Sequence, residues 1–253
     1  MLKKFVVLTI ISALSLASLS FEACANAASF SDEEDFENYD ASNEEVYDPL
    51  EKYNRKIYVF NDFLDRYFLE YVAKEYRNDI PKPARDAVRN FLNNLSSPIS
   101  AFNSFIQGKG ENGLATFSNF LINSTIGVLG FFDVAGEKGI RYHQEDFGQT
   151  LGHYGIKSGP YLMVPFVGPS SIRDFSGSIT DQVVSPASYN AFKIGGKTYL
   201  IGKDRLISIT AMRTVDTRES LIDIIDDVRK ESFDSYATLR SAYTQKRNNE
   251  IKN

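Results

Sequence analysis

The sequence has no tryptophan, only two histidines, and a single cysteine, Cys24. A lone cysteine cannot form an internal disulfide. Cys24 also lies outside the predicted folded body, so it cannot act as a nucleophile in its core. The two histidines, His143 and His153, have no standard metal-site spacing with Glu145 or Asp146. We therefore predict no metal and no other cofactor.

Motifs of nucleotide and ester chemistry are missing as well. There is no Walker loop, and no G-x-G-x-x-G opens a helix after a strand. Ser170 and Ser171 follow Gly168-Pro169, but no G-x-S-x-G surrounds them. We interpret Arg173-Asp174 and Asp181 as an ion pair or helix caps. No basic stripe indicates nucleic-acid binding, and nothing in the chain predicts an enzyme.

Charge is scarce in two neighbouring stretches. Residues 112–132 contain no charged residue, and between Asp146 and Arg173 the only formal charge is Lys157. Glycine and proline are too frequent in the second stretch for one long helix. Two such stretches predict contact with something apolar besides the protein's own core. The alternative is an ordinary buried centre with loops.

The N-terminus is typical of an export signal spanning residues 1–27. Lys3 and Lys4 precede an uncharged run of apolar and small residues, and Ala25-Asn26-Ala27 offers a small-x-small cleavage pattern. A second interpretation makes Cys24 a lipidated first residue, although Glu22 departs from the usual lipoprotein signal. A retained anchor is a third, but the run is short for a membrane span. We favour cleavage after Ala27.

Residues 28–49 are acidic, without a basic residue and with few core-forming residues, so we expect a disordered, solvated tether. Without residues 1–49, 26 basic and 23 acidic residues remain. The body, predicted at 50–247 with a tail at 248–253, is therefore mildly basic.

Helical signals dominate this body, which we predict to be all-α and a single compact domain. Asp48-Pro49-Leu50-Glu51 has the spacing of a helix N-cap with a capping box, and Asp216–Glu219 repeats it. Ser97-Pro98 predicts the start of another helix. Apolar residues recur at helical spacing after the first signal, at Ile57, Phe60, Phe63, Leu64, Tyr67, Phe68, Tyr71 and Val72.

The uncharged stretch 112–132 also favours a helix with one apolar face. Gly127 and Gly130 permit a tight bend after it. A helix lying in or under one membrane leaflet, with aromatics toward acyl chains, fits this pattern; a buried hairpin is the alternative. The residues expected to face the membrane are Phe120, Leu121, Leu129, Phe131 and Phe132.

Long blocks of the chain resemble the MlaA family, also called VacJ, of outer-membrane phospholipid-transport proteins of Gram-negative bacteria. The blocks read FLINSTIGVLGFFDVAG and FGQTLGHYGIKSGPYLMVPFVGPSSIRD, with DPLEKYNRKIYVFND upstream and DTRESL and SYATLRSAYTQKR downstream. The resemblance implies a ring of helices in the inner leaflet of the outer membrane, around an amphipathic channel for phospholipids. It also implies trimeric porins as neighbours and a soluble periplasmic lipid-carrier protein as recipient.

A mobile wall for the lipid path is expected in the Gly/Pro-rich hairpin, residues 155–169. The predicted lining residues are Tyr161, Met163, Val164, Pro165 and Phe166. Two other functions stay open. One is a periplasmic adaptor that docks on the membrane without a pore. The other is a lipid hydrolase, which would need His143 or His153 placed against a serine or an acid.

Mass spectrometry of the mature N-terminus tests the signal interpretation. We expect the protein to begin at Ala28 and to carry no acyl chain. A diacylglyceryl group on Cys24 would contradict this prediction.

Overall fold

The computed structural model describes residues 46–184, 192–194, 197–199 and 203–252. The export signal, Cys24, Ala27 and most of the predicted tether lie outside these residues. The described chain is mainly helical, as the sequence predicts. The helices are α4 (Glu51–Leu64), the π-helical turn η1 (Asp65–Leu69), α5 (Glu70–Asp79), α6 (Lys82–Ile106), α7 (Gly110–Thr125), α8 (Val134–Glu137), α9 (Phe147–His153), α10 (Ile172–Val184), α11 (Lys203–Ser220), α12 (Ile222–Glu231) and α13 (Ser235–Lys252).

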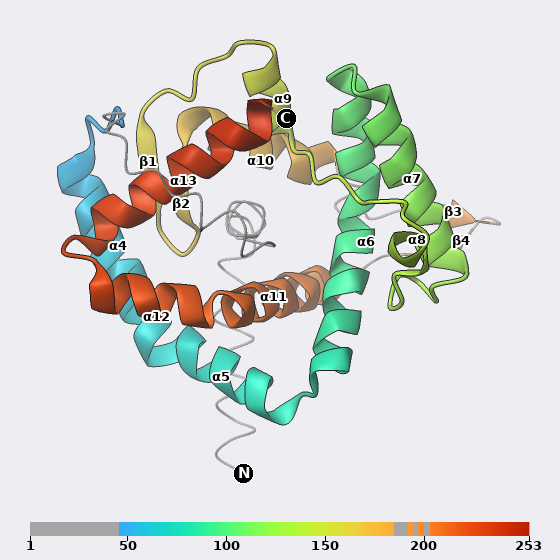
Figure 1. Cartoon of the computed structure of the whole chain (residues 1–253), viewed down its shortest axis with the longest axis horizontal. Coiled ribbons are helices and arrows are strands. Elements are labelled where there is room, and N and C mark those ends of the chain that lie inside the picture. The colour runs from blue at the N-terminus through green and yellow to red at the C-terminus, as the bar shows by residue number, and fades with distance from the viewer. Residues whose placement is uncertain (1–45, 185–191, 195–196, 200–202, 253) are drawn as a thin grey trace.

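Strands form two small antiparallel pairs. Strands β1 (Tyr161–Val164) and β2 (Gly168–Ser171) pair as a hairpin, and β3 (Phe192–Ile194) pairs with β4 (Lys197–Tyr199). Viewed down the shortest axis, the helices are arranged around the periphery of the molecule (Figure 1). Helices α6 and α7 pack against each other on one side. Helix α13 contacts α9 and β2, so the last helix packs against elements from the middle of the chain.

Two asparagines on α4 hold the β1–β2 hairpin against the first helix. Asn54 Nδ2 donates to the Tyr161 carbonyl at 3.0 Å, and the Met163 amide donates to Asn54 Oδ1 at 2.9 Å. One heptad later, Asn61 Nδ2 donates to the Val164 carbonyl at 2.9 Å, and the Phe166 amide donates back to Asn61 Oδ1 at 2.8 Å. Each amide therefore satisfies one backbone donor and one acceptor of the hairpin.

The predicted N-cap role of Asp48 is wrong. Helix α4 begins at Glu51 without a side-chain cap. The Asp48 carboxylate instead accepts from Asn54 Nδ2 at 2.8 Å, from Arg240 Nη1 at 2.9 Å and from the Tyr236 hydroxyl. Its side chain is almost completely buried. Asp48 therefore belongs to the folded body and not to the tether, because it joins the two ends of the described chain.

The predicted tail also belongs to the body. Helix α13 continues to Lys252, and Glu250 accepts a hydrogen bond from Arg247 Nη1 at 2.8 Å. Ile251 packs close to Gly152 of α9, where an added Cβ would lie 2.6 Å from its Cδ1. These contacts hold the C-terminal turns against α9.

The helix start predicted at Ser97-Pro98 is wrong, since α6 runs through Pro98 without interruption. An interior proline removes a backbone donor. In the turn before Pro98, backbone carbonyls accept hydrogen bonds from side chains. Ser96 and Ser97 hydroxyls donate to the carbonyls of Leu92 and Asn93 at 3.3 and 3.0 Å. Arg213 Nη2 also donates to the Leu92 carbonyl, at 2.6 Å.

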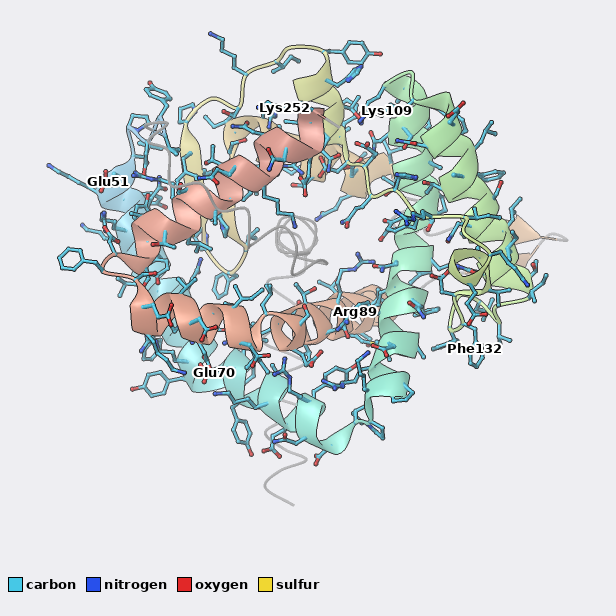
Figure 2. All side chains as sticks on the ribbon, in the orientation of Figure 1. Glu51, Glu70, Arg89, Lys109, Phe132 and Lys252 are labelled. Carbon is cyan, nitrogen blue, oxygen red and sulfur yellow. The ribbon has the colours of Figure 1, made fainter. Side chains whose placement is uncertain are left out.

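The second predicted capping box is wrong for a different reason. Asp216 and Glu219 lie in the last turns of α11 and are buried. Asp216 accepts from Arg89 Nε at 3.0 Å, and Glu219 accepts from Arg77 Nε at 2.9 Å. Figure 2 shows Arg89 on the side of α6 that faces α11. These acids join α11 to α5 and α6, and α12 begins without a side-chain cap.

A buried polar cluster joins α9, α10 and α13. Arg247 donates to Asp146 at 2.8 and 3.0 Å and to Asp174 at 3.0 Å. Arg173 forms the predicted ion pair with Asp174 at 2.9 Å. Asp181 accepts from the Phe147 amide at 2.8 Å, at the start of α9. The expectation of ion pairs and caps for these residues is confirmed.

The Asp48 contacts predict a large effect from one residue of the acidic stretch. Asp48→Ala removes the buried carboxylate that partly buried Arg240 contacts, and breaking a buried ion pair costs about 3–5 kcal/mol. We expect the free energy of unfolding of the purified protein to fall by that amount in denaturant titration. Asp40→Ala is the control, and we expect no change. Equal stabilities of the two variants would contradict the prediction.

Asp181 predicts a pH-dependent stability. Burial raises the pKa of its carboxyl from 3.8 to about 7. The folded state therefore retains this proton between about pH 4 and 7 while the unfolded state loses it, so stability falls as pH rises through this window. Asp181→Asn removes this titration. Its free energy of unfolding, measured by denaturant titration, should therefore rise relative to that of the unchanged protein as pH rises from about 4 to 7, by up to about 1.4 kcal/mol per pH unit. A constant difference between pH 4 and 8 would contradict this prediction.

Candidate functional site

Burial in the described chain is inverted relative to a water-soluble protein. The buried polar and charged residues outnumber the buried hydrophobic ones, and many large hydrophobic side chains are exposed. Scattered exposed apolar residues are normal, but contiguous exposed patches and buried polar groups are informative. The candidate site is built from three features of this kind.

The first feature is the outer face of α7 and the loop that follows. The polar residues Thr116, Asn119 and Asn123 are buried, whereas Leu114, Phe117 and Leu121 are exposed. Asn119 Nδ2 donates to the Ile140 carbonyl at 2.9 Å, and Asn123 Nδ2 donates to Asp133 at 2.8 Å. The polar face therefore holds the segment after α7, and the apolar face is left outside.

The second feature is the loop itself, residues 126–132. Val128 and Leu129 have φ of 53° and 60°, in the left-handed region that L-residues rarely adopt. Gly127 and Gly130 make the tight path possible. A Cβ on Gly127 would lie 2.2 Å from the Phe132 carbonyl oxygen, and one on Gly130 would lie 2.4 Å from Asn94 Cβ. The strained loop projects apolar side chains outward.

Of the five residues predicted to face a membrane, four are exposed and Phe120 is partly buried. Leu129 and Phe132 are each 62% exposed, and Leu121 and Phe131 are also exposed. Figure 2 shows Phe132 at the outer edge of the molecule. Phe131 stacks on Phe91, with ring centroids 4.9 Å apart. Phe120 is partly buried, its ring 6.4 Å from that of Phe117. What these side chains contact outside the protein stays a prediction.

A further outward apolar surface lies on α4, η1 and α5. Its exposed members are Val59, Phe60, Phe63, Tyr67 and Tyr71. The sequence pattern marks the 3-and-4 spacing of Phe60, Phe63, Tyr67 and Tyr71, but it does not show that they are exposed. Figure 1 shows α4 and α7 on opposite sides of the molecule, so apolar surface faces outward on both sides.

The third feature is the β1–β2 hairpin, where the structure corrects part of the predicted lining. Tyr161 and Met163 are only 2% and 1% exposed, and they form the hydrophobic core cluster with Tyr236 and Tyr243. Val164 is buried as well. Tyr161 and Met163 lie on one face of β1, because side chains alternate along a strand, and this face packs against Tyr236 and Tyr243 of α13. All three side chains are covered by other described parts of the protein.

Only the turn of the hairpin presents the predicted residues outward. Phe166 is 48% exposed with φ of 64°, and Pro165 is partly buried. The Phe166 ring meets that of Phe60 edge-on, with centroids 5.3 Å apart. The Phe166 side chain therefore lies between the exposed surface of α4 and the interior of the protein.

A pocket of about 230 Å³ lies behind Phe166, between η1, the hairpin turn, α12 and α13. Its walls are aliphatic and include Ile224 and Ile225 of α12 and Leu239 and Ala242 of α13. Charged residues also line it: Asp62, Asp65, Arg218 and Arg229. Sequence reasoning missed this pocket. Its two arginines lie more than 150 positions from the aspartates that they contact, and no local signal predicts these contacts.

The residues that a metal site or a hydrolase would use can be located in the structure. Within them, no group of three or more His, Cys, Asp or Glu residues is placed to hold a metal ion. The His143 amide donates to Thr116 Oγ1 at 3.1 Å, and the His153 ring packs edge-on against Tyr154. No described helix is long and apolar enough to cross a membrane.

The comparisons with known proteins point to one family. A family model described as MlaA lipoprotein matches residues 46–250. The intermembrane phospholipid transport system lipoprotein MlaA of Escherichia coli is 36% identical over 204 residues, covering 79% of this chain and 76% of that protein. The protein of the same name from Haemophilus influenzae is 32% identical over 241 residues, covering 94% and 88%.

A solved structure agrees with the sequence comparisons. It was determined to explain the maintenance of bacterial outer membrane lipid asymmetry. It is 34% identical to this chain, with a TM-score of 0.69, and the match covers 81% of this chain and 98% of the other.

Proposed function

This chain belongs to the MlaA family of lipoproteins, and from that premise we propose that it is a non-catalytic phospholipid channel of the outer membrane. In this proposal it removes mislocalised phospholipid from the outer leaflet and so maintains the lipid asymmetry of the membrane. It passes the lipid to a soluble periplasmic carrier and works beside a trimeric porin. The role of the E. coli relative in an intermembrane phospholipid transport system supports this function.

The inverted burial is the single observation that carries the proposal. Exposed apolar faces on α7, on the 126–132 loop and on α4–α5 would be unfavourable in water, but they are favourable against acyl chains. Apolar surface on opposite sides of the molecule suits a protein surrounded by lipid. We place the body in the inner leaflet, at the periplasmic face, where the exposed apolar faces of α7 and α4–α5 would contact acyl chains.

The route for lipid in this proposal passes the hairpin turn and the pocket behind it. Moving a two-tailed lipid through water exposes its chains, at about 0.8 kcal/mol per methylene. The aliphatic walls of the pocket can shield a chain, while its charged residues offer polar contacts to a headgroup. No covalent chemistry is needed for such a transfer, in keeping with a transport family.

The adaptor alternative predicts a different burial of the apolar residues. A protein that only docks on the membrane would bury its uncharged stretches in its own core. Leu121, Leu129 and Phe132 are exposed instead. Membrane fractionation separates the two functions: an embedded protein resists salt and urea and needs detergent, whereas an adaptor washes off.

Two positions with the same backbone geometry test the proposal. Leu129 and Phe166 are both exposed residues with φ near 60°, a conformation that Asp tolerates. Leu129→Asp places a charge among acyl chains, at a cost of about 2.5–3.5 kcal/mol, and should reduce the membrane-bound fraction. Phe166→Asp should leave the protein in the membrane but impair lipid removal, measured as surface-exposed phospholipid and detergent sensitivity of the cells.

Histidine variants are the controls for catalysis. His143→Gln and His153→Gln should retain lipid removal. If His153→Gln abolished it in a folded protein while Phe166→Asp had no effect, the hydrolase would replace the channel as the better explanation.

A further inference from the structure

Arg218 has a hydrogen-bond donor that no group in the described part of the chain uses. Its Nε and Nη2 donate to the two oxygens of Asp65 at 2.7 and 2.9 Å. The side chain is only 4% exposed, and its Nη1 is buried without a hydrogen-bond partner among the described residues. A buried donor without an acceptor is unfavourable, and native proteins rarely leave one. Arg218 lines the 230 Å³ pocket, so the unused donor belongs to a side chain that a ligand in the pocket would contact.

The neighbouring arginine shows the contrast. Arg229 also lines the pocket, but its Nε and Nη2 donate to Asp62 and its Nη1 donates to Glu70 at 2.8 Å. All three of its nitrogens are used. Arg218 is therefore the arginine of this pocket with a donor to offer, and the bidentate contact with Asp65 fixes the plane of its guanidinium.

The surroundings limit what the acceptor can be. The three carboxylates of Asp62, Asp65 and Glu70 outnumber the two guanidinium groups of Arg218 and Arg229, so the site does not favour a free small anion. Most of the exposed surface of the wall is apolar. At about 230 Å³, the pocket exceeds the roughly 150 Å³ cavity that accommodates benzene. An alkyl chain that carries an acceptor oxygen meets both requirements.

We propose that this pocket binds one acyl chain of a lipid, and that an oxygen attached to that chain accepts a hydrogen bond from Arg218 Nη1. The inference rests on the proposed transport function and assigns Arg218 as a determinant of its specificity. A phospholipid offers ester and phosphate oxygens, and a free fatty acid offers a carboxylate. Both share the chemistry that the site requires.

The absence of tryptophan from the chain provides a direct assay. Ile225→Trp places one fluorophore in the pocket wall, and brominated lipids quench it on contact. The probes are phosphatidylglycerol with dibrominated chains, dibrominated stearate, and a dibrominated hydrocarbon without oxygen, each added to the full chain in detergent micelles. We expect saturable quenching by the phospholipid, reversed by its unbrominated form. Phe233→Trp, at a fully exposed position, should show only quenching proportional to the probe in the micelle.

Second substitutions in the Ile225→Trp protein test the two parts of the site. Arg218→Met should weaken binding of the oxygen-bearing probe about tenfold and leave the hydrocarbon unchanged. Arg66→Met is the matched control, because Arg66 pairs with Asp62 but does not line the pocket. Ala242→Phe should fill the pocket and abolish saturable quenching, whereas Ala237→Phe on the same helix, outside the pocket lining, should not.

The outcomes separate this inference from the function on which it rests. Saturable quenching that survives Ala242→Phe would overturn the pocket as the site. Equal binding of all probes, unaffected by Arg218→Met, would overturn the role of Arg218. Tighter binding of stearate than of phospholipid would make a fatty acid the ligand. If the pocket binds no lipid while cells with this protein still clear surface phospholipid, the inference fails and the proposed function stands.

Discussion

Buried charges in this fold must find their partners inside the protein, and the rest of the architecture depends on that constraint. Arg229 of α12 contacts Asp62, Asp65 and Glu70, which lie on three successive helical segments of the first half of the chain. Glu219 of α11 pairs with Arg77, Arg85 and Arg89. Breaking a buried pair leaves an uncompensated charge. The C-terminal helices are thereby fixed on α4, α5 and α6.

Polar packing on the inside explains the apolar outside. A helix that meets its neighbours through asparagine, threonine and charged residues does not need its hydrophobic face for folding. Helix α7 shows this directly, since Asn119 and Asn123 are buried and Leu121 is exposed. The same division leaves Phe63 and Tyr67 exposed beside the buried ion pairs of η1. Exposed apolar surface of this kind is unfavourable in water, and the proposed function places it against a lipid leaflet.

The β1–β2 hairpin combines two roles that its sequence does not separate. Tyr161 and Met163 belong to the small hydrophobic core, and Asn54 and Asn61 hold the hairpin backbone on α4. The turn alone remains exposed, with Phe166 in the left-handed conformation above the pocket. A rigidly held hairpin with one exposed aromatic at its tip suits a wall that meets lipid at a single place.

The sequence by itself determined the helical class, the two stretches with little charge and the family resemblance, because periodicity, composition and long motifs are local properties of the chain. It also marked Leu121, Leu129 and Phe132 as unusual. Only the tertiary structure decided which apolar residues form the core, since Met163 and Phe166 belong to the same uncharged run and end in opposite environments. The core and a lipid leaflet accept the same side chains, so an apolar pattern does not reveal which of them it faces. The roles of Asp48, Asp216 and Arg218 were likewise decided by partners more than a hundred residues away in the chain.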